Sequence, residues 1–118
     1  MLKDLVQTYY SGIAGKSGWE EPLSREITFN SPGAPAVSGK AAFVKATNAF
    51  LRFVKAATPK QTLYDSDTAC VWMAYDLVSP TGREGSLDVL EIWKSAAERL
   101  DNLTIYFDRA AFGQFMQS

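Results

Sequence analysis

The chain has 118 residues, of which 47% are hydrophobic and 21% are charged, and its formal net charge is −1. This length and composition are typical of one globular domain, so we expect a single domain over residues 1–118 and no disordered region. The balanced charge and the lack of a basic cluster argue against a nucleic-acid partner. No stretch approaches the roughly 18 apolar residues of a membrane helix. No signal peptide is apparent either, so we expect a cytoplasmic protein without membrane association.

Histidine is absent from the sequence. This absence removes Ser-His-Asp and Cys-His mechanisms and the usual zinc and non-haem iron sites, so we expect no metal and no cofactor. Any acid–base chemistry must use Asp, Glu, Tyr, Lys or Cys. The single cysteine, Cys70, is interpreted as an inert small hydrophobic residue.

Hydrophobic periodicity predicts the elements in chain order. A helical period appears at residues 2–14 and again at 40–57, where Thr58-Pro59 would end the second helix. The Pro- and Gly-rich stretch 31–39 between them is predicted to be a loop. Strand-like alternation predicts five strands, at residues 25–30, 61–65, 68–79, 86–94 and 100–108. The C-terminal tail is predicted to form at most one helical turn.

Helices followed by a meander of strands predict an α+β fold, with the helices on one face of an antiparallel sheet. "SPTGRE" contains Gly82 and predicts the hairpin turn between the strands 68–79 and 86–94. A two-residue turn at Thr81-Gly82 would place Trp72 opposite Glu91.

Glu91 lies in the middle of the apolar strand "DVLEIWK". A carboxylate in such a position costs several kcal/mol unless it is paired or neutralised. It is therefore interpreted either as a pocket residue or as half of a structural ion pair, with Lys94 or Arg99 of a partner chain as candidate cations. Apolar surroundings would raise the pKa of its carboxyl, so we expect Glu91 to be largely neutral near pH 7 and to donate a hydrogen bond to a ligand oxygen.

The order "YY", "ITFNSP" followed by "SG" and a helix, and a meander containing "VLEIWK" and ending in "LTIYFD" resembles the nuclear transport factor 2-like superfamily, with its SnoaL-like proteins and ketosteroid isomerases. The resemblance covers nearly the whole chain. It implies a cone-shaped, curved antiparallel sheet wrapped around N-terminal helices (a cystatin-like architecture), with a deep pocket between them. It also implies a homodimer through the convex sheet face.

In ketosteroid isomerases a carboxylic acid and a helix tyrosine bind the substrate oxyanion, and an aspartate before a proline is the general base. The resemblance places Glu91 at the acid and Tyr9 at the tyrosine, with Tyr10 as the alternative. Ser31 stands at the base position, where serine cannot act as a carboxylate. Limonene epoxide hydrolases share this fold, and of their Asp-Arg-Asp set only Asp76 is retained. Both residue sets are therefore incomplete.

The candidate catalytic residues are Glu91, Tyr9 and Asp76. Strand alternation and the family match predict further residues that face a mainly apolar pocket and bind a small molecule. They are Phe29, Ser31, Phe50, Trp72, Val89, Trp93, Leu103, Ile105 and Phe107.

The first hypothesis is a protein that binds a small, apolar, oxygen-bearing molecule. An isomerase-, dehydratase- or cyclase-type enzyme that uses Glu91 as general acid or base is the alternative, and a protein–protein interaction module with a filled cavity is the third. The residues predicted to face outward form an apolar patch that we expect to pack against a second copy of the chain. They are Val71, Met73, Tyr75, Leu77, Leu90, Ile92, Thr104 and Tyr106.

Overall fold

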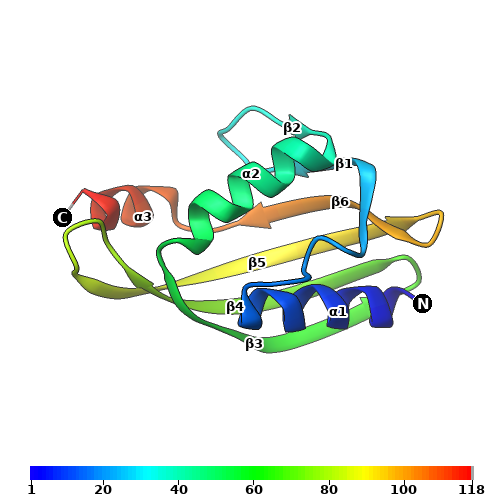
Figure 1. Cartoon of the computed structure of the whole chain (residues 1–118), viewed down its shortest axis with the longest axis horizontal. Coiled ribbons are helices and arrows are strands. Elements are labelled where there is room, and N and C mark those ends of the chain that lie inside the picture. The colour runs from blue at the N-terminus through cyan, green and yellow to red at the C-terminus, as the bar shows by residue number, and fades with distance from the viewer. Residues whose placement is uncertain (118) are drawn as a thin grey trace.

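The computed structural model describes residues 1–117, which form three helices and one six-stranded sheet (Figure 1). In chain order the elements are α1 (Leu2–Gly15), β1 (Leu23–Asn30), β2 (Val37–Ser38), α2 (Lys40–Leu51), β3 (Val54–Asp65), β4 (Thr68–Val78), β5 (Glu84–Ala96), β6 (Arg99–Tyr106) and α3 (Arg109–Met116). No helix within residues 1–117 is long and apolar enough to cross a membrane.

The strands lie in the order β2-β1-β6-β5-β4-β3. Neighbours pair antiparallel except β1 and β6, which pair in parallel, so the sheet is mixed. Helices α1 and α2 pack on one face of the sheet, and α3 lies at the end opposite the N-terminus (Figure 1). The predicted α+β architecture, a curved sheet around helices, is confirmed, and the core fills the space between sheet and helices.

Helix α1 packs closely against the segment that follows it, because the helix residue at the contact is Gly12. A Cβ atom at Gly12 would lie 2.6 Å from Trp19 Cα, closer than real side chains permit. The close approach lets Trp19 bury its side chain completely against Tyr9, with the ring centroids 6.2 Å apart. This contact holds the segment after α1 against the helix.

The second helix ends earlier than its periodicity predicts. It stops at Leu51, and Val54 already begins β3. Pro59 lies inside β3, beside an irregularity in its pairing with β4. Proline is tolerated more readily in an edge strand such as β3, because one side of the strand has no partner to which an N–H would donate.

The hairpin between β4 and β5 has a three-residue loop, so the predicted two-residue turn is wrong. Ser79 N donates to Arg83 O at 2.8 Å, and Gly82, with φ of 90°, completes the loop. Glu91 is therefore opposite Val71 rather than Trp72. A shift of one residue turns every β4 side chain to the other face of the sheet.

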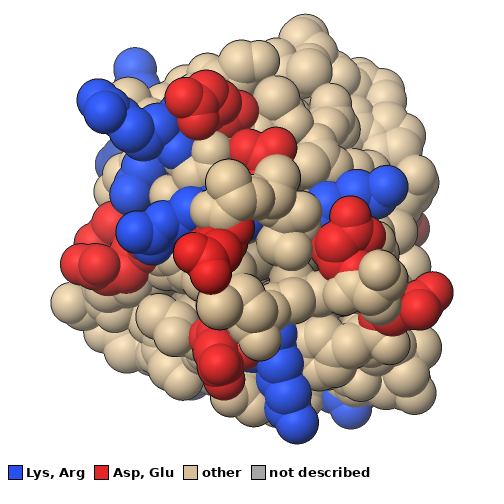
Figure 2. Space-filling model, turned by 90° about the vertical axis from the view of Figure 1, so that its right-hand side faces the viewer, with Lys and Arg blue, Asp and Glu red and all other residues tan. Residues whose placement is uncertain are grey.

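Charges of both signs lie side by side on the end of the molecule that carries the N-terminus and the β3–β4 and β5–β6 turns (Figures 1 and 2). Two ion pairs occur among the described residues, and both are exposed: Lys55 with Glu84 at 3.1 Å, and the N-terminal amine with Asp4 at 4.0 Å. Exposed pairs of this kind contribute little to stability. The fold therefore depends on its apolar core.

Candidate ligand-binding site

A cavity of about 160 Å³ lies between the helices and the inner face of the sheet. Most of the side chains that line it are apolar or aromatic, and no Asp, Lys, Arg or Cys is among them. Eight of the predicted site residues line it: Tyr9, Phe29, Phe50, Val89, Glu91, Leu103, Ile105 and Phe107. Ile13, Phe43, Ala46, Thr47, Leu51, Tyr75, Leu87 and Phe112 complete the lining.

Among residues 1–117, Glu91 is the only one that brings a carboxylate to the cavity wall, and it is 5% exposed. It projects from the middle of β5, on the face shared with Val89 and Trp93. Tyr10 from α1 donates a hydrogen bond to Glu91 Oε1, and Tyr75 from β4 donates to Oε2 at 2.6 Å. Both carboxyl oxygens therefore have partners, and those partners are neutral.

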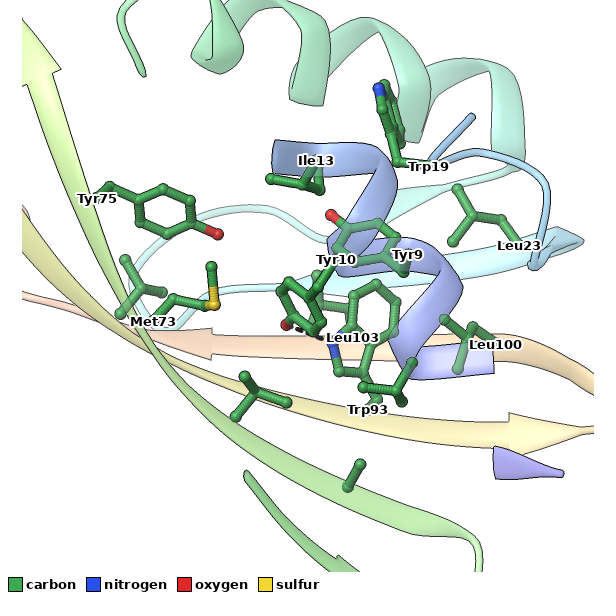
Figure 3. Packing of buried hydrophobic residues seen from close by; sticks show 14 of the residues in the cluster. Tyr9, Tyr10, Ile13, Trp19, Leu23, Met73, Tyr75, Trp93, Leu100 and Leu103 are labelled. Atoms are coloured by element: carbon green, nitrogen blue, oxygen red, sulfur yellow. Dashed lines mark hydrogen bonds between the residues drawn. The ribbon is translucent and has the colours of Figure 1, made fainter. Parts of the chain in front are cut away.

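The Tyr10 hydroxyl also accepts a hydrogen bond from the indole of Trp93. Trp93 Nε1 donates to the Tyr10 hydroxyl oxygen at 2.8 Å (Figure 3). The Trp93 side chain is completely buried, and the Tyr9 ring packs edge-on against it, with ring centroids 4.6 Å apart. The order Trp93–Tyr10–Glu91–Tyr75 thus forms one buried chain of hydrogen bonds that ends at the cavity.

Burial raises the pKa of Glu91 from its ordinary value of 4.5 to about 7, although the hydrogen bonds from Tyr10 and Tyr75 act in the opposite direction. The apolar wall disfavours the ionised form more strongly than two phenol donors favour it. Burial also raises the pKa values of Tyr9, Tyr10 and Tyr75 well above 10.0, with the negative charge of Glu91 as a second cause. Near pH 7 the tyrosines therefore stay neutral while Glu91 changes its charge.

Glu91 has no cationic partner within residues 1–117, and an ion pair with Lys94 or Arg99 of a partner chain stays a prediction. Its polar contacts among residues 1–117 are the two tyrosine hydroxyls, and neither Lys94 nor Arg99 reaches it. Arg99 instead donates to the Glu21 carbonyl at 3.0 Å, and Lys94 is exposed.

Four predicted positions need correction. Trp72 and Asp76 lie on the outer face, because the three-residue hairpin loop reverses β4. Ser31 does not line the cavity, and its hydroxyl accepts a hydrogen bond from Arg109 at 3.3 Å. Trp93 faces inward as predicted but lies beneath Tyr9 and Tyr10 rather than in the wall.

The tyrosine that contacts Glu91 from the helix is Tyr10, the alternative choice, and not Tyr9. The two are adjacent on α1 and both are buried, so helical periodicity does not distinguish them. Tyr9 lines the cavity instead. Tyr75 was missed, although strand alternation with a three-residue loop would have placed it on the inner face together with Val71 and Met73.

No protein-family model matches the chain, and no curated protein matches it by sequence. Solved structures of similar shape do exist. An NTF2-like protein of unknown function from Burkholderia pseudomallei superposes with a TM-score of 0.87 at 12% identity, over 99% of this chain and 98% of that one. A protein from Jannaschia sp. CCS1 described as a SnoaL-like polyketide cyclase gives 0.86 at 12% identity, over 99% and 92%.

A third similar structure is TerC, co-crystallised with polyporic acid, with a TM-score of 0.86 and 16% identity over 99% of this chain and 98% of that one. At these identities the likeness concerns the fold. The chain has the nuclear transport factor 2-like fold, as the sequence resemblance predicted, and the functions of proteins that share a fold differ widely.

Proposed function

We propose that the protein binds a small, mainly apolar molecule that carries an oxygen atom, with Glu91 and its tyrosines at the polar end of the cavity. The observation that carries this proposal is a cavity with an apolar wall and one carboxyl, whose two oxygens are engaged only by neutral groups. A structural ion pair or a filled core would not need this arrangement. Pockets for small molecules combine an apolar wall with few placed polar groups.

The size of the cavity limits the ligand. A buried apolar cavity of about 150 Å³ holds a molecule such as benzene, so about 160 Å³ suits a single six-membered ring with small substituents. Serine at position 31, where the isomerases have a carboxylate base, lies outside the cavity and argues against steroid isomerisation.

An isomerase-, dehydratase- or cyclase-type enzyme is the second candidate, because the pKa of Glu91 is raised to about 7. A general acid or base works best when its pKa lies near the operating pH. The similar structure described as a SnoaL-like polyketide cyclase is consistent with this class. In an enzyme of this kind, Glu91→Gln would remove turnover while it preserves ligand binding.

We also propose a homodimer through the outer face of the sheet. Four of the residues predicted to face outward do not belong to that face. Val71, Met73, Tyr75 and Leu77 face the core instead. The outer face carries a row of cross-strand neighbours, Trp72, Leu90 and Tyr106, which are 38%, 39% and 48% exposed. Ile92 and Thr104 continue this apolar face, which we call the outer patch.

Binding of benzene, followed by NMR shifts of cavity methyl groups, tests the proposed function. Thr47→Trp puts a large ring into the cavity and should abolish benzene binding. The adjacent Asn48→Trp is the matched control, because Asn48 is exposed on the same helix and should leave binding intact. Absence of benzene binding, or binding that survives Thr47→Trp, would contradict the proposal.

A further inference from the structure

The direction of the hydrogen bonds in the Trp93–Tyr10–Glu91–Tyr75 chain is set at its buried end. An indole N–H can only donate, so the Tyr10 oxygen must accept from Trp93. Tyr10 has one proton, and its donor contact is with Glu91 Oε1. Oε1 is therefore held as an acceptor, whatever the charge of Glu91.

The other oxygen, Oε2, faces Tyr75. When Glu91 is ionised, Oε2 can only accept, so Tyr75 donates its proton across the 2.6 Å contact between the two oxygens. The Tyr75 oxygen then keeps its lone pairs, and we infer that they face the cavity because Tyr75 is one of the residues that line it. In this state the site offers an acceptor to a ligand.

When Glu91 binds a proton, protonation of one of its two carboxyl oxygens costs less free energy than protonation of the other. On Oε1 it would oppose the Tyr10 proton, and Tyr10, which is buried outside the cavity wall, would have to direct its own proton to a new acceptor. A buried donor without an acceptor is costly. On Oε2 the new proton is donated to Tyr75, whose own proton then turns toward the cavity and a ligand oxygen.

We propose that Tyr75, rather than Glu91, is the group that meets the ligand, and that proton binding at Glu91 Oε2 switches the Tyr75 hydroxyl from acceptor to donor toward the cavity. The protonated state selects a ligand with a carbonyl or ether oxygen. The ionised state selects a ligand with a hydroxyl donor. This inference rests on the proposed function, since it needs a molecule in the cavity.

Of the ionisable groups that face Glu91, none titrates near neutral pH, so the switch depends on the proton of Glu91 alone. From α1 these are Tyr9 and Tyr10, and from β4 it is Tyr75. The cavity residues of α2, β6 and α3 are not ionisable. All three tyrosine pKa values are well above 10.0, so Glu91 alone titrates near neutrality, where its pKa is about 7.

The test compares two probes of one ring size, cyclohexanone, which can only accept a hydrogen bond, and benzene, which has no oxygen. Dissociation constants are measured by NMR from about pH 5.5 to about pH 8.5. Cyclohexanone should bind roughly tenfold more weakly at the higher pH, the effect of one hydrogen bond, and benzene should change much less.

Two variants locate the donor. In Glu91→Gln the amide oxygen accepts from Tyr10 and the amide nitrogen donates to Tyr75, which reproduces the protonated state; cyclohexanone should then bind at the low-pH affinity throughout. Tyr75→Phe should lose roughly tenfold affinity for cyclohexanone at low pH, together with the pH dependence. Tyr9→Phe, also in the cavity wall, should retain the pH dependence.

The outcomes separate the two proposals. If both probes bind without pH dependence, or if Tyr75→Phe keeps the pH dependence of the unmodified chain, the switch is wrong and the binding function stands. The latter result would mean that Glu91 itself donates to the ligand. If neither probe binds, the proposed function fails and the switch fails with it.

Discussion

At the scale of single residues, the buried acid is stabilised by neutral partners. Two phenol hydroxyls bind the Glu91 carboxyl, and the Trp93 indole orients one of them. This arrangement satisfies hydrogen bonds and leaves the charge unbalanced, so burial keeps the pKa raised. The residue can thus exist in an apolar wall in either form near neutrality.

The raised pKa makes the stability of the protein depend on pH. A carboxyl whose pKa is about 7 when folded and 4.5 as its ordinary value favours the folded state fully below pH 4.5. That contribution is lost as the pH rises through 7. At about 1.4 kcal/mol per pKa unit the loss is about 3 kcal/mol.

Urea unfolding between pH 4 and 8 measures this loss. The free energy of unfolding should decrease by more in the unmodified chain than in Glu91→Gln, whose side chain does not titrate. Equal pH profiles for the two proteins would show that Glu91 has an ordinary pKa in the folded state.

At the scale of elements, local periodicity predicts the type of each element better than its pairing. Helix 2–14 and the inner face of β5 follow directly from their patterns. The length of the loop after Ser79 does not, because "SPTGRE" suits a two-residue or a three-residue hairpin, and that single residue decides which side of β4 is buried. This is why Tyr75 could not be assigned to the site.

The parallel pairing of β1 with β6 also could not be predicted from the alternation of apolar and polar residues. The two strands are far apart in the chain, and the alternation of each is compatible with either direction. Val54 also shows that a pattern can suit two structures. It continues the helical period of Phe50 and Leu51, but it is the first residue of β3 and is buried there.

Two glycines of α1 give a matched test of its packing. Gly12→Ala would place a Cβ against the Trp19 backbone and should destabilise the protein by about 1–3 kcal/mol. Gly15→Ala meets no atom within 4 Å and should be neutral or stabilise the helix by up to about 1 kcal/mol. Thermal unfolding of both variants checks this, and equal changes in stability would contradict the close packing of α1 on Trp19.

At the scale of the whole molecule, the two faces of the sheet have different roles. The inner face closes the cavity and carries Glu91. The outer patch exposes Trp72, Leu90 and Tyr106 in one row, more contiguous apolar surface than scattered single residues provide. A second copy of the chain is the occupant that we propose.

Leu90→Lys should convert the proposed dimer into a monomer, because the row would then present a charge to its own copy. Gln7→Lys introduces the same charge on the exposed side of α1 and should leave the dimer intact. Sedimentation velocity at micromolar concentration distinguishes the species. If the unmodified chain sediments as a monomer, the proposed homodimer is wrong.

The most direct test of the central claim, that the site holds an acid which changes its charge near neutrality, is a carbon-detected NMR titration of the Glu91 carboxyl. We expect a pKa of about 7, and a higher value in Tyr10→Phe, since the hydrogen bond from Tyr10 lowers it. A pKa near the ordinary value of 4.5, unchanged in Tyr10→Phe, would contradict the claim.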